Sequence, residues 1–536
     1  MSLPPSPPAA GPGERRIVLA ALLAAIALLV THAFLLRAFV VDDAFITFRF
    51  ARNVAQGIGP VFNPGEHVEG FSNPLYMFLL SGLYRIVGAD GPFPVVGRLV
   101  GVLASIGSLV VLARMPGVTP RRIVGLAMIL TAMSVSLCMW SIGGLESTLY
   151  GFVLTLGVAG TVARPTTARA QIGLGLVLAA IALSRPEGLM PAGILFLWRL
   201  ADPVTRGDAR GHLRVLLAAA VPVLAYYAFR VAYYGQWVPN TYFAKRMALS
   251  RALPLGRYYL TAFVRDNGGW FLYLPAVLAL FDRTHRYVAW VASSVVGVCL
   301  LFVLLVGGDW MQNHRFVAPV VPLLSLLAAL GWFRLGEFIA RRAGKAFATA
   351  ARIGAAAAPV VLFALCTYPA IAVQRRTPYV NVSPYFDTVG RLLGAAAPPE
   401  WTLALHDIGA VGWYGKVRVL DLMGLVEPDI AHRRLTVDEI VERRRPELLL
   451  LHYDNRTPPR ERWRSIEMPD FDRIYVMPRS PVPLPGALRV RADVASRFEA
   501  GLRTLPPDLV RDLEALDRYL ANREPDGFPI RPRVTS

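Results

Sequence analysis

Long apolar runs separated by short arginine-rich segments dominate the first 372 residues of the chain. The first run covers residues 17–41, and a helix of about 20 apolar residues is long enough to cross a bilayer. Ten further runs predict spans at roughly 95–113, 123–140, 146–163, 170–184, 187–200, 213–230, 268–281, 287–306, 316–333 and 353–372. The pattern predicts an α-helical polytopic membrane protein with about 11 transmembrane helices in residues 17–372, after a disordered cytoplasmic N-terminus at 1–16.

The arginines between these runs predict the orientation of the spans. Arg15 and Arg16 precede the first run, and cytoplasmic loops are enriched in Lys and Arg. With eleven spans, every later arginine-rich loop also falls on the cytoplasmic side, provided that the apolar stretch 73–88 does not cross. We therefore expect residues 73–88 to form a helix at the outer surface, and the C-terminal part of the chain to be extracytoplasmic.

From about residue 373 the pattern changes to short β-rich runs that alternate with polar segments. The runs TLALHD, KVRVLDLMGL, ELLLLHY, DRIYVMP and ALRVRA predict strands, TVDEIVERRR predicts a helix, and residues 506–522 predict a last helix. This pattern indicates a soluble α/β domain at residues 373–536.

Composition supports a membrane protein and argues against a nucleic-acid-binding one. Hydrophobic residues make up 54% of the chain and the mean hydropathy is +0.45. The net charge of +19 lies almost entirely before residue 373, where 31 Lys and Arg face 14 Asp and Glu, so the excess serves topology. The three cysteines all lie in apolar runs and offer neither a disulfide framework nor a zinc site.

Asp42 and Asp43 stand where the first span leaves the lipid. They open the stretch VDDAFITFRFARN, which predicts a helix at the outer membrane surface with Asp42, Arg49 and Asn53 near one face. Carboxylates at this depth are costly to keep dry, so a polar cavity is the functional interpretation. A helix-capping aspartate with a solvated neighbour is the structural alternative. Asp42 is the favoured catalytic base, because a nearby Arg49 would keep it ionised.

Other unusual polar residues gather at the same outer ends of the spans, as a substrate cavity at the membrane surface would require. Each has a structural alternative: Glu146 could complement a helix dipole, Arg185 and Glu187 could form an ion pair at a turn, and Lys245 beside Tyr242 could snorkel to the interface. The candidate substrate-binding residues are Arg49, Glu146, Arg185, Glu187, Tyr242, Lys245, Asp309, Trp310, His314, Arg315 and Asp407.

Carboxylates beside cations at the outer face predict a phosphate-activated donor attacked by a hydroxyl. An Asp would accept the hydroxyl proton, while Lys245 and Arg315 would bind the departing phosphate. No P-loop, dinucleotide fingerprint or Cys/His metal spacing is present in the sequence; a divalent cation is left open, and no other cofactor is expected. Nucleotides are absent from the outer compartment, so the donor would be lipid-linked.

Several segments resemble a known family. VDDAFITFRFARNVAQGIGPVFNPGEHVEGFSNPLY, GGLESTLYGF, SRPEG, PNTYFAK, GGDWMQNHRFVAPVVPL and HDIGAVGWYGKVRVLDLMGL are similar to AftB-like arabinofuranosyltransferases, which have the GT-C fold. The resemblance implies a polyprenyl-phosphate-sugar donor, a catalytic aspartate at Asp42 or Asp43 and a supporting acid at Glu146. Residues 72–99 also resemble the outer-surface helix and following arginine of lipid A aminoarabinose transferases, although the lysine of those relatives is Asn73 here.

Three functions follow from these observations. The leading one is a glycosyltransferase of the plasma membrane that moves arabinofuranose or another pentose from polyprenyl phosphate to a cell-envelope glycan. A transferase acting on protein or lipid A is the second, and a transporter or flippase of lipid-linked sugars is the third. A transporter should place ionisable residues near mid-membrane in paired halves. The one-sided clustering of polar residues favours an enzyme.

Overall fold

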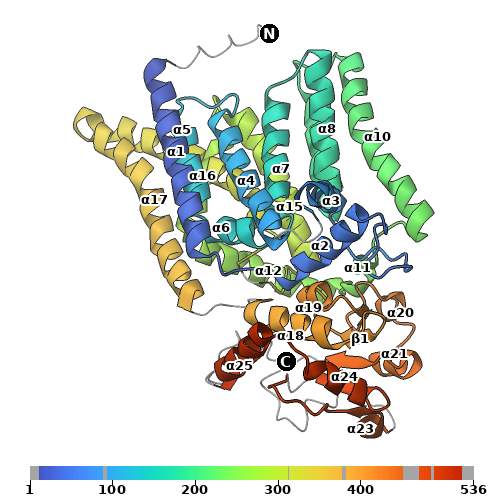
Figure 1. Ribbon diagram of the computed structural model, residues 1–536. Helices are drawn as coiled ribbons and strands as arrows, with labels where there is room; N and C mark the ends of the chain where they lie inside the picture. The colour runs from blue at the N-terminus through green and yellow to red at the C-terminus, as the bar shows by residue number, and fades with distance from the viewer. Residues whose placement is uncertain are drawn as a thin grey trace.

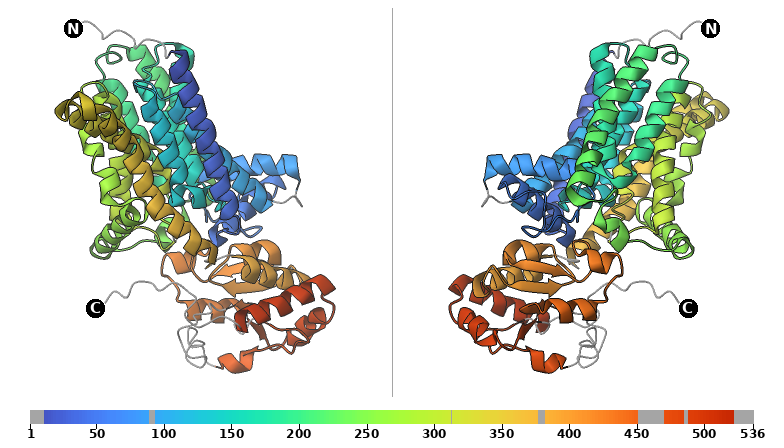
Figure 2. Two further views of the ribbon diagram at one scale, coloured as in Figure 1. Left: turned by 90° about the vertical axis from the view of Figure 1, so that its left-hand side faces the viewer. Right: turned by 90° about the vertical axis from the view of Figure 1, so that its right-hand side faces the viewer.

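A bundle of helices stands on a smaller unit that contains a β-sheet (Figure 1). The computed structural model describes residues 11–88, 93–311, 313–376, 382–450, 470–484 and 488–521. Two side views show the sheet-containing unit at one end of the bundle only (Figure 2). We refer to residues 382–450, 470–484 and 488–521 as the C-terminal unit.

The bundle is formed by the first seventeen helices and two short 3-10 turns. Their bounds are α1 Pro12–Leu35, α2 Asp42–Ala55, α3 Pro74–Val87, α4 Phe93–Ala113, α5 Arg122–Met133, α6 Val135–Ile142, α7 Ser147–Val162, α8 Ala168–Ser184, η1 Pro186–Gly188, α9 Leu189–Ala201, α10 Ala209–Tyr234, α11 Asn240–Ala244, α12 Leu249–Asp266, α13 Gly269–Tyr273, α14 Ala276–Ala279, α15 Arg286–Val306, η2 Ala318–Val320, α16 Val321–Arg342 and α17 Gly344–Arg376.

Six helices in the described residues are long and apolar enough to cross a membrane: α1, α4, α10, α15, α16 (with η2) and α17. The pair α5 and α6, bent by 62°, would be a seventh. Several predicted spans are shorter helices of 10–17 residues, among them α7, α8 and the region of α13 and α14. The chain is therefore a multi-pass membrane protein with six or seven full-length candidate spans among the described residues, and the other predicted spans are shorter or broken helices.

Two predicted spans differ from the structure in their bounds. Helix α1 begins at Pro12 and ends at Leu35, so residues 12–16 are helical rather than disordered. Proline suits the first turn of a helix because its missing N–H would be unpaired there, and Glu14 complements the helix dipole. The span predicted at 268–281 begins at Gly268 and Gly269, which take positive φ angles of 101° and 73°. It is divided into α13 and α14 at Leu274 and Pro275, because proline has no N–H to continue the helical hydrogen bonds.

Side-chain hydrogen bonds connect the bend between α5 and α6 to Asn267, just before α13. Between α5 and α6 the Ser134 hydroxyl donates to Asn267 Oδ1 at 3.0 Å, and Asn267 Nδ2 donates to Ser136 Oγ at 3.2 Å. Irregular backbone at membrane depth needs such partners, because lipid offers none. Hydrogen bonds inside the bundle therefore stabilise the bend between α5 and α6.

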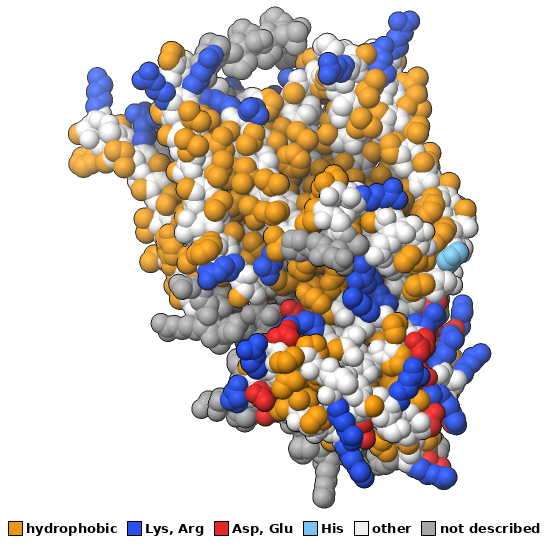
Figure 3. Space-filling model, in the orientation of Figure 1, with side chains coloured by type: hydrophobic (Ala, Val, Ile, Leu, Met, Phe, Trp, Pro, Cys, Tyr) orange, Lys and Arg blue, Asp and Glu red, His pale blue; other side chains and the backbone are white. Residues whose placement is uncertain are grey.

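Surface chemistry separates the two ends of the bundle. On the face in view, hydrophobic side chains form a broad band over the bundle, only Lys and Arg mark its end far from the C-terminal unit, and that unit carries both Lys and Arg and acidic side chains (Figure 3). Helix α2 lies at the other end, against α3 and against helix α19 (Ala410–Gly415) of the C-terminal unit. The helix predicted for VDDAFITFRFARN is confirmed as α2, and the helix predicted at residues 73–88 is confirmed as α3.

The C-terminal unit has a five-stranded mixed sheet in the order β2-β1-β3-β5-β4. Strand β1 pairs in parallel with β2 and β3, whereas β5 is antiparallel to β3 and β4. All five predicted strand runs contain one of these strands, and both predicted helices are present as α21 and α25. The bounds are α18 Val382–Ala396, β1 Thr402–Leu405, α19 Ala410–Gly415, β2 Arg418–Asp421, α20 Pro428–Ala431, α21 Val437–Arg444, β3 Leu448–Leu450, α23 Phe471–Ile474, β4 Tyr475–Val476, β5 Leu488–Arg491, α24 Ala495–Leu502 and α25 Pro507–Ala521.

A buried ion pair fastens the loop between α2 and α3 to α10. Both Glu69 oxygens accept hydrogen bonds from Arg230, at 2.8 and 3.1 Å, and Oε1 also accepts one from the Tyr226 hydroxyl at 2.5 Å. The Glu69 and Arg230 side chains are only 1% and 6% exposed. Glu69 also accepts a bond from the backbone N–H of Asn240, so the same loop holds the start of α11.

We expect Glu69→Ala to lower the stability of the protein markedly. The change leaves the Arg230 guanidinium buried without its carboxylate, a loss of about 3–5 kcal/mol. Thermal unfolding in detergent measures it. The matched control is Glu400→Ala, which removes an ion pair with Arg497 whose side chains are 66% and 63% exposed and should change stability by under about 1 kcal/mol. Equal shifts in the two variants would contradict the structural role of Glu69.

Candidate active site

Asp42 and Asp43 begin helix α2, and the helix directs them to different surroundings. Successive residues of an α-helix point about 100° apart. Both acids lie in the first turn, where a carboxylate complements the helix dipole. The N–H of Val41, just before them, donates to the Gly143 carbonyl at 3.4 Å, which ties the start of α2 to the loop before α7.

Asp42 is buried against the C-terminal unit. Its Oδ2 accepts a hydrogen bond from the Gly409 N–H at 2.9 Å, and its Oδ1 accepts one from the Ala410 N–H at 2.7 Å. Burial, with a smaller effect of the Asp407 charge, raises the pKa of Asp42 to about 8 although these two bonds lower it. Both oxygens are therefore occupied by contacts within the protein.

Asp43 faces a group of charged side chains. Its side chain is 20% exposed, and its Oδ2 lies 3.9 Å from Nζ of Lys245, which is 52% exposed. Burial raises the pKa of Asp43 above its ordinary value, and the positive charges of Lys245 and Arg315 offset part of this rise. Asp43 thus combines access with nearby cations.

Arg315 provides a second cation with bonding capacity to spare. Its Nε lies 2.6 Å from Asp309 Oδ2 in an ion pair without hydrogen-bond geometry, and no hydrogen bond joins its two terminal nitrogens to another described residue. The ring of Phe316 contacts two guanidiniums, that of Arg315 at 4.9 Å and that of Arg185 at 4.7 Å. A guanidinium with unused donors can bind two oxygens of one phosphate.

A buried acidic pair supports Arg185. Glu146 Oε1 accepts from Arg185 Nη1 at 2.5 Å, its Oε2 accepts from Asn73 Nδ2 at 2.8 Å, and Glu187 accepts from Arg185 Nε. Burial alone would raise the pKa of Glu146, but the charges of Arg185 and Arg315 lower it overall. Glu146, Arg185 and Glu187 form one network beside Arg315.

Asp407 comes to the same place from the C-terminal unit. It follows β1, at the carboxyl end of a parallel strand, where loops of α/β sheets commonly carry functional groups. It stands two residues before Gly409, whose N–H binds Asp42, and its charge raises the pKa of both Asp42 and Asp43. The structure therefore gathers Asp43, Lys245, Asp309, Arg315 and Asp407 around one junction.

Other candidates lie further from this group or are bound within the protein. Arg49 donates four hydrogen bonds to oxygens of the protein: Phe62 O, Gly412 O, Asn63 Oδ1 and Val417 O. Its contacts are with the loop and the C-terminal unit rather than with Asp42. His314 bonds Asp266 at 3.1 Å, while Tyr242 and Trp310 are 53% and 60% exposed.

Sequence reasoning missed the groups that hold the candidates in place. Asn73, Phe316 and the N–H groups of Gly409 and Ala410 were not singled out as such supports. Asn73 stands in the polar segment FNPGEHVEGFSNP, which was singled out as a whole. The backbone amides carry no sequence signal, because any residue but proline would provide them.

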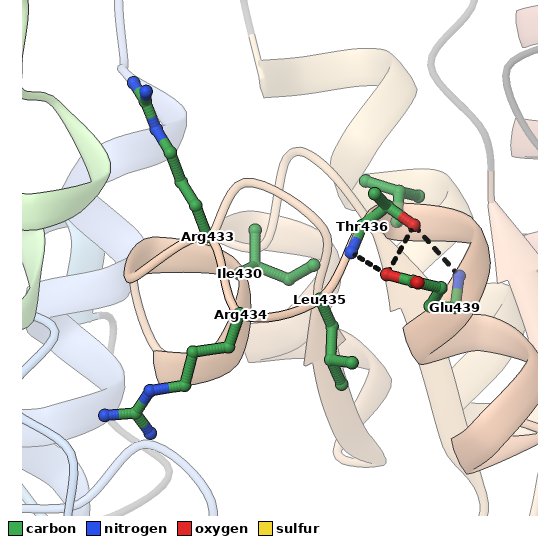
Figure 4. A pocket seen from close by; sticks show the side chains of 7 residues that line it. Ile430, Arg433, Arg434, Leu435, Thr436 and Glu439 are labelled. Atoms are coloured by element: carbon green, nitrogen blue, oxygen red, sulfur yellow. Dashed lines mark hydrogen bonds between the residues drawn. The ribbon is translucent and has the colours of Figure 1, made fainter.

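The described residues give no evidence of a metal-binding group. No set of three or more His, Cys, Asp or Glu among them is arranged to hold an ion. A separate hollow of about 310 Å³ lies between α20 and α21 (Figure 4). There Thr436 and Glu439 bind each other in a capping box, and the labelled side chains of Arg433 and Arg434 point away from them. The hollow offers no comparable chemistry.

Comparisons with known proteins show which families this chain is similar to. Residues 372–491 match a domain of unknown function (DUF8728). The chain is 29% identical over 346 residues to a terminal beta-(1->2)-arabinofuranosyltransferase of Mycobacterium tuberculosis, covering 55% of this chain and 52% of that protein. It is 26% identical over 330 residues to the enzyme of the same name from Corynebacterium glutamicum, covering 54% and 47%. The chain thus spans about half the length of these relatives.

The crystal structure of ArnT from Cupriavidus metallidurans in the apo state superposes with a TM-score of 0.57 at 13% identity, over 88% of this chain and 98% of that one. The chain has a GT-C fold. A second ArnT structure, bound to undecaprenyl phosphate, superposes with a TM-score of 0.55 at 14% identity, over 90% of this chain and 98% of that one. The GT-C fold and the relationship to the arabinofuranosyltransferases confirm the resemblance predicted from sequence.

Proposed function

We propose that this chain transfers an arabinofuranosyl residue, or another pentose, from a polyprenyl-phosphate donor to a glycan of the cell envelope. The observation that carries the proposal is the meeting of Asp43 with Lys245 and Arg315 at the junction of bundle and C-terminal unit. The relatives named as arabinofuranosyltransferases support the sugar, and the GT-C fold shared with ArnT supports a lipid-linked donor.

In the proposed reaction a hydroxyl oxygen of the acceptor attacks the anomeric carbon of the donor sugar. The hydroxyl proton passes to the Asp43 carboxylate as the new C–O bond forms. The bond between the anomeric carbon and the phosphate oxygen breaks, and polyprenyl phosphate leaves with the bonding electrons. Lys245 and Arg315 stabilise the negative charge that develops on that phosphate.

Asp43 replaces Asp42 as the proposed base on geometric grounds. A base must be within reach of the proton that it accepts. Asp42 is 5% exposed and binds two backbone N–H groups through both oxygens, whereas Asp43 is accessible and has Lys245 beside it. Arg49, which was expected to keep Asp42 ionised, binds backbone and Asn63 oxygens instead.

We also propose that the chain lies in the plasma membrane and passes it eleven times, with the site and the C-terminal unit outside the cytoplasm. One of these crossings is the segment at residues 267–285, and contacts at its two ends support counting it. Asp266, before the segment, binds His314 at the site end. His285, after it, binds Thr119 in an arginine-rich loop at the other end. Residues 267–285 therefore connect the two ends without a full-length helix.

A transporter and a transferase require ionisable residues at different places in the molecule. A transporter requires ionisable groups at a central site between two repeats. The candidate residues lie instead at one end, beside the C-terminal unit, which favours a transferase. A protein or lipid A acceptor is distinguished from a glycan by the acceptor that supports product formation.

The direct test is transfer by the purified protein in lipid nanodiscs. Polyprenyl-phosphoryl-arabinofuranose serves as the donor and a synthetic arabinan oligosaccharide as the acceptor, and mass spectrometry detects a product that is one pentose heavier. Formation of that product supports the proposal. Absence of product from pentose and hexose donors alike, with intact folded protein, would reject it.

We expect Asp43→Asn to slow sugar transfer about 100-fold or more while donor binding stays unchanged, because the amide keeps the shape but cannot accept the proton. The wild-type rate should rise with pH through the pKa of Asp43, since only the carboxylate is a base. The control is Asp512→Asn, which changes an exposed pair with Arg391 and should leave the rate unchanged. A near wild-type rate for Asp43→Asn would exclude Asp43 as the base.

We expect Lys245→Ala and Arg315→Ala each to reduce kcat/KM for the donor by about 10- to 150-fold. A lost charge-assisted contact to phosphate costs about 1.5–3 kcal/mol. Arg315→Lys keeps the charge and tests for a bidentate contact. Lys345→Ala, an exposed lysine at the start of α17, is the matched control. Unchanged kinetics in both alanine variants would remove the phosphate assignment.

We expect single cysteines to reveal the orientation in a chain whose three native cysteines are replaced by alanine. A cysteine at Glu442, exposed on α21, should react with an impermeant maleimide in intact cells, whereas one at Arg206, exposed between α9 and α10, should react only after lysis. The reverse pattern would contradict the proposed topology.

A further inference from the structure

The segment that matches a domain of unknown function is the one that meets the candidate site. It covers residues 372–491, and its helix α19 packs against α2 of the bundle. Asp42 accepts the N–H groups of Gly409 and Ala410 at the start of this contact. The role of this segment can therefore be sought at its contacts with the bundle.

The contact between α19 and α2 is close and rigid. A Cβ atom on Gly409 would lie 2.0 Å from the Asp42 backbone oxygen and 2.5 Å from its Oδ2, so the two backbones approach as only glycine permits. Trp413 lies under the Arg52 guanidinium at 4.1 Å and against the rings of Phe45 and Phe48. These contacts fix both the position and the rotation of α2.

A second contact fixes α11, which precedes Lys245. Asn240 Nδ2 donates to the backbone oxygens of Gly424 and Leu425 at 2.8 and 3.1 Å. The rings of Phe243 and His432 lie 4.1 Å apart. The C-terminal unit thus holds the elements that carry Asp43 and Lys245, from two different loops.

The same unit carries a third carboxyl, Asp407, which follows β1 and stands two residues before Gly409, the residue whose N–H binds Asp42. A carboxylate would repel the donor phosphate, which Lys245 and Arg315 attract. Carboxylates accept hydrogen bonds from sugar hydroxyls, so Asp407 suits the side of the site at which an acceptor sugar enters.

We propose that the C-terminal unit completes the active site: it holds α2 and α11 so that Asp43 and Lys245 face each other, and its Asp407 binds a hydroxyl of the acceptor sugar. This inference rests on the proposed glycosyltransferase function and gives the matched domain a role in that function. Asp42 and Gly409 are positioning residues, which act through Asp43.

Gly409→Ala tests the positioning role, with Gly415→Ala as its matched control. A Cβ on Gly415, in the same helix, would meet its neighbours at 3.7 Å, an ordinary contact distance. Gly409→Ala should lower kcat at least about tenfold, because a shift of about 1 Å can cost as much as 100-fold. Its KM for the donor should stay within about twofold, since Arg315 and Lys245 remain. Gly415→Ala should match the wild type. Wild-type kcat in folded Gly409→Ala protein would overturn the proposal.

Asp407→Asn tests the acceptor role and does not depend on the fate of Gly409→Ala. It should raise KM for the arabinan acceptor about tenfold, the effect of about 1.4 kcal/mol, while slow hydrolysis of the donor by water stays at the wild-type rate. A structural defect would reduce both reactions equally, and that outcome or an unchanged KM would reject the acceptor role. Failure of the wild-type protein to use any donor would instead reject the proposed function.

Discussion

The arrangement of the candidate site depends on one contact, the two hydrogen bonds that the Asp42 carboxyl accepts from Gly409 and Ala410. A buried carboxylate is costly unless its oxygens are satisfied, and backbone N–H groups satisfy them with little loss of side-chain freedom. The contact joins positions 367 and 368 residues apart in the chain. It therefore sets the rotation of α2, and the next residue, Asp43, turns toward the cations.

Polar side chains further along α2 and in the loop that follows it reinforce this junction. Arg49 donates to Gly412 and Val417 at 2.6 and 3.0 Å, and the Asn63 amide binds both the N–H and the carbonyl of Val419. These groups satisfy backbone positions next to a sheet edge that would otherwise lack partners. A polar junction of this kind has demanding geometry, because each misplaced group leaves a buried donor or acceptor unpaired. The C-terminal unit is accordingly fixed on the bundle rather than tethered to it.

Local pattern predicted much of the architecture but not the partners of individual side chains. The start of α2 at Asp42, the short helix α3 and the five strands followed from apolar periodicity and turn residues. The broken segment at 268–281 was predicted as a helix because its composition is apolar, although Gly268 and Gly269 lie at its start. The choice between Asp42 and Asp43 could not be made from sequence. Helical spacing says that the two differ, but only the distant amides decide which one is enclosed.

Arg49 and Arg315 show why residue type alone does not identify a ligand-binding arginine. Both are buried at 4% and 7% exposure, and both stand in polar motifs at the outer ends of the predicted spans. Arg49 donates four hydrogen bonds to protein oxygens, so a phosphate would have to displace them. Among the described residues, Arg315 forms an ion pair with Asp309 through Nε and no other, and its guanidinium and that of Arg185 both lie within 5 Å of the Phe316 ring. A guanidinium that is oriented on one edge and unbonded on the other needs no rearrangement to bind an anion, and such preorganisation is what electrostatic stabilisation of a leaving phosphate requires.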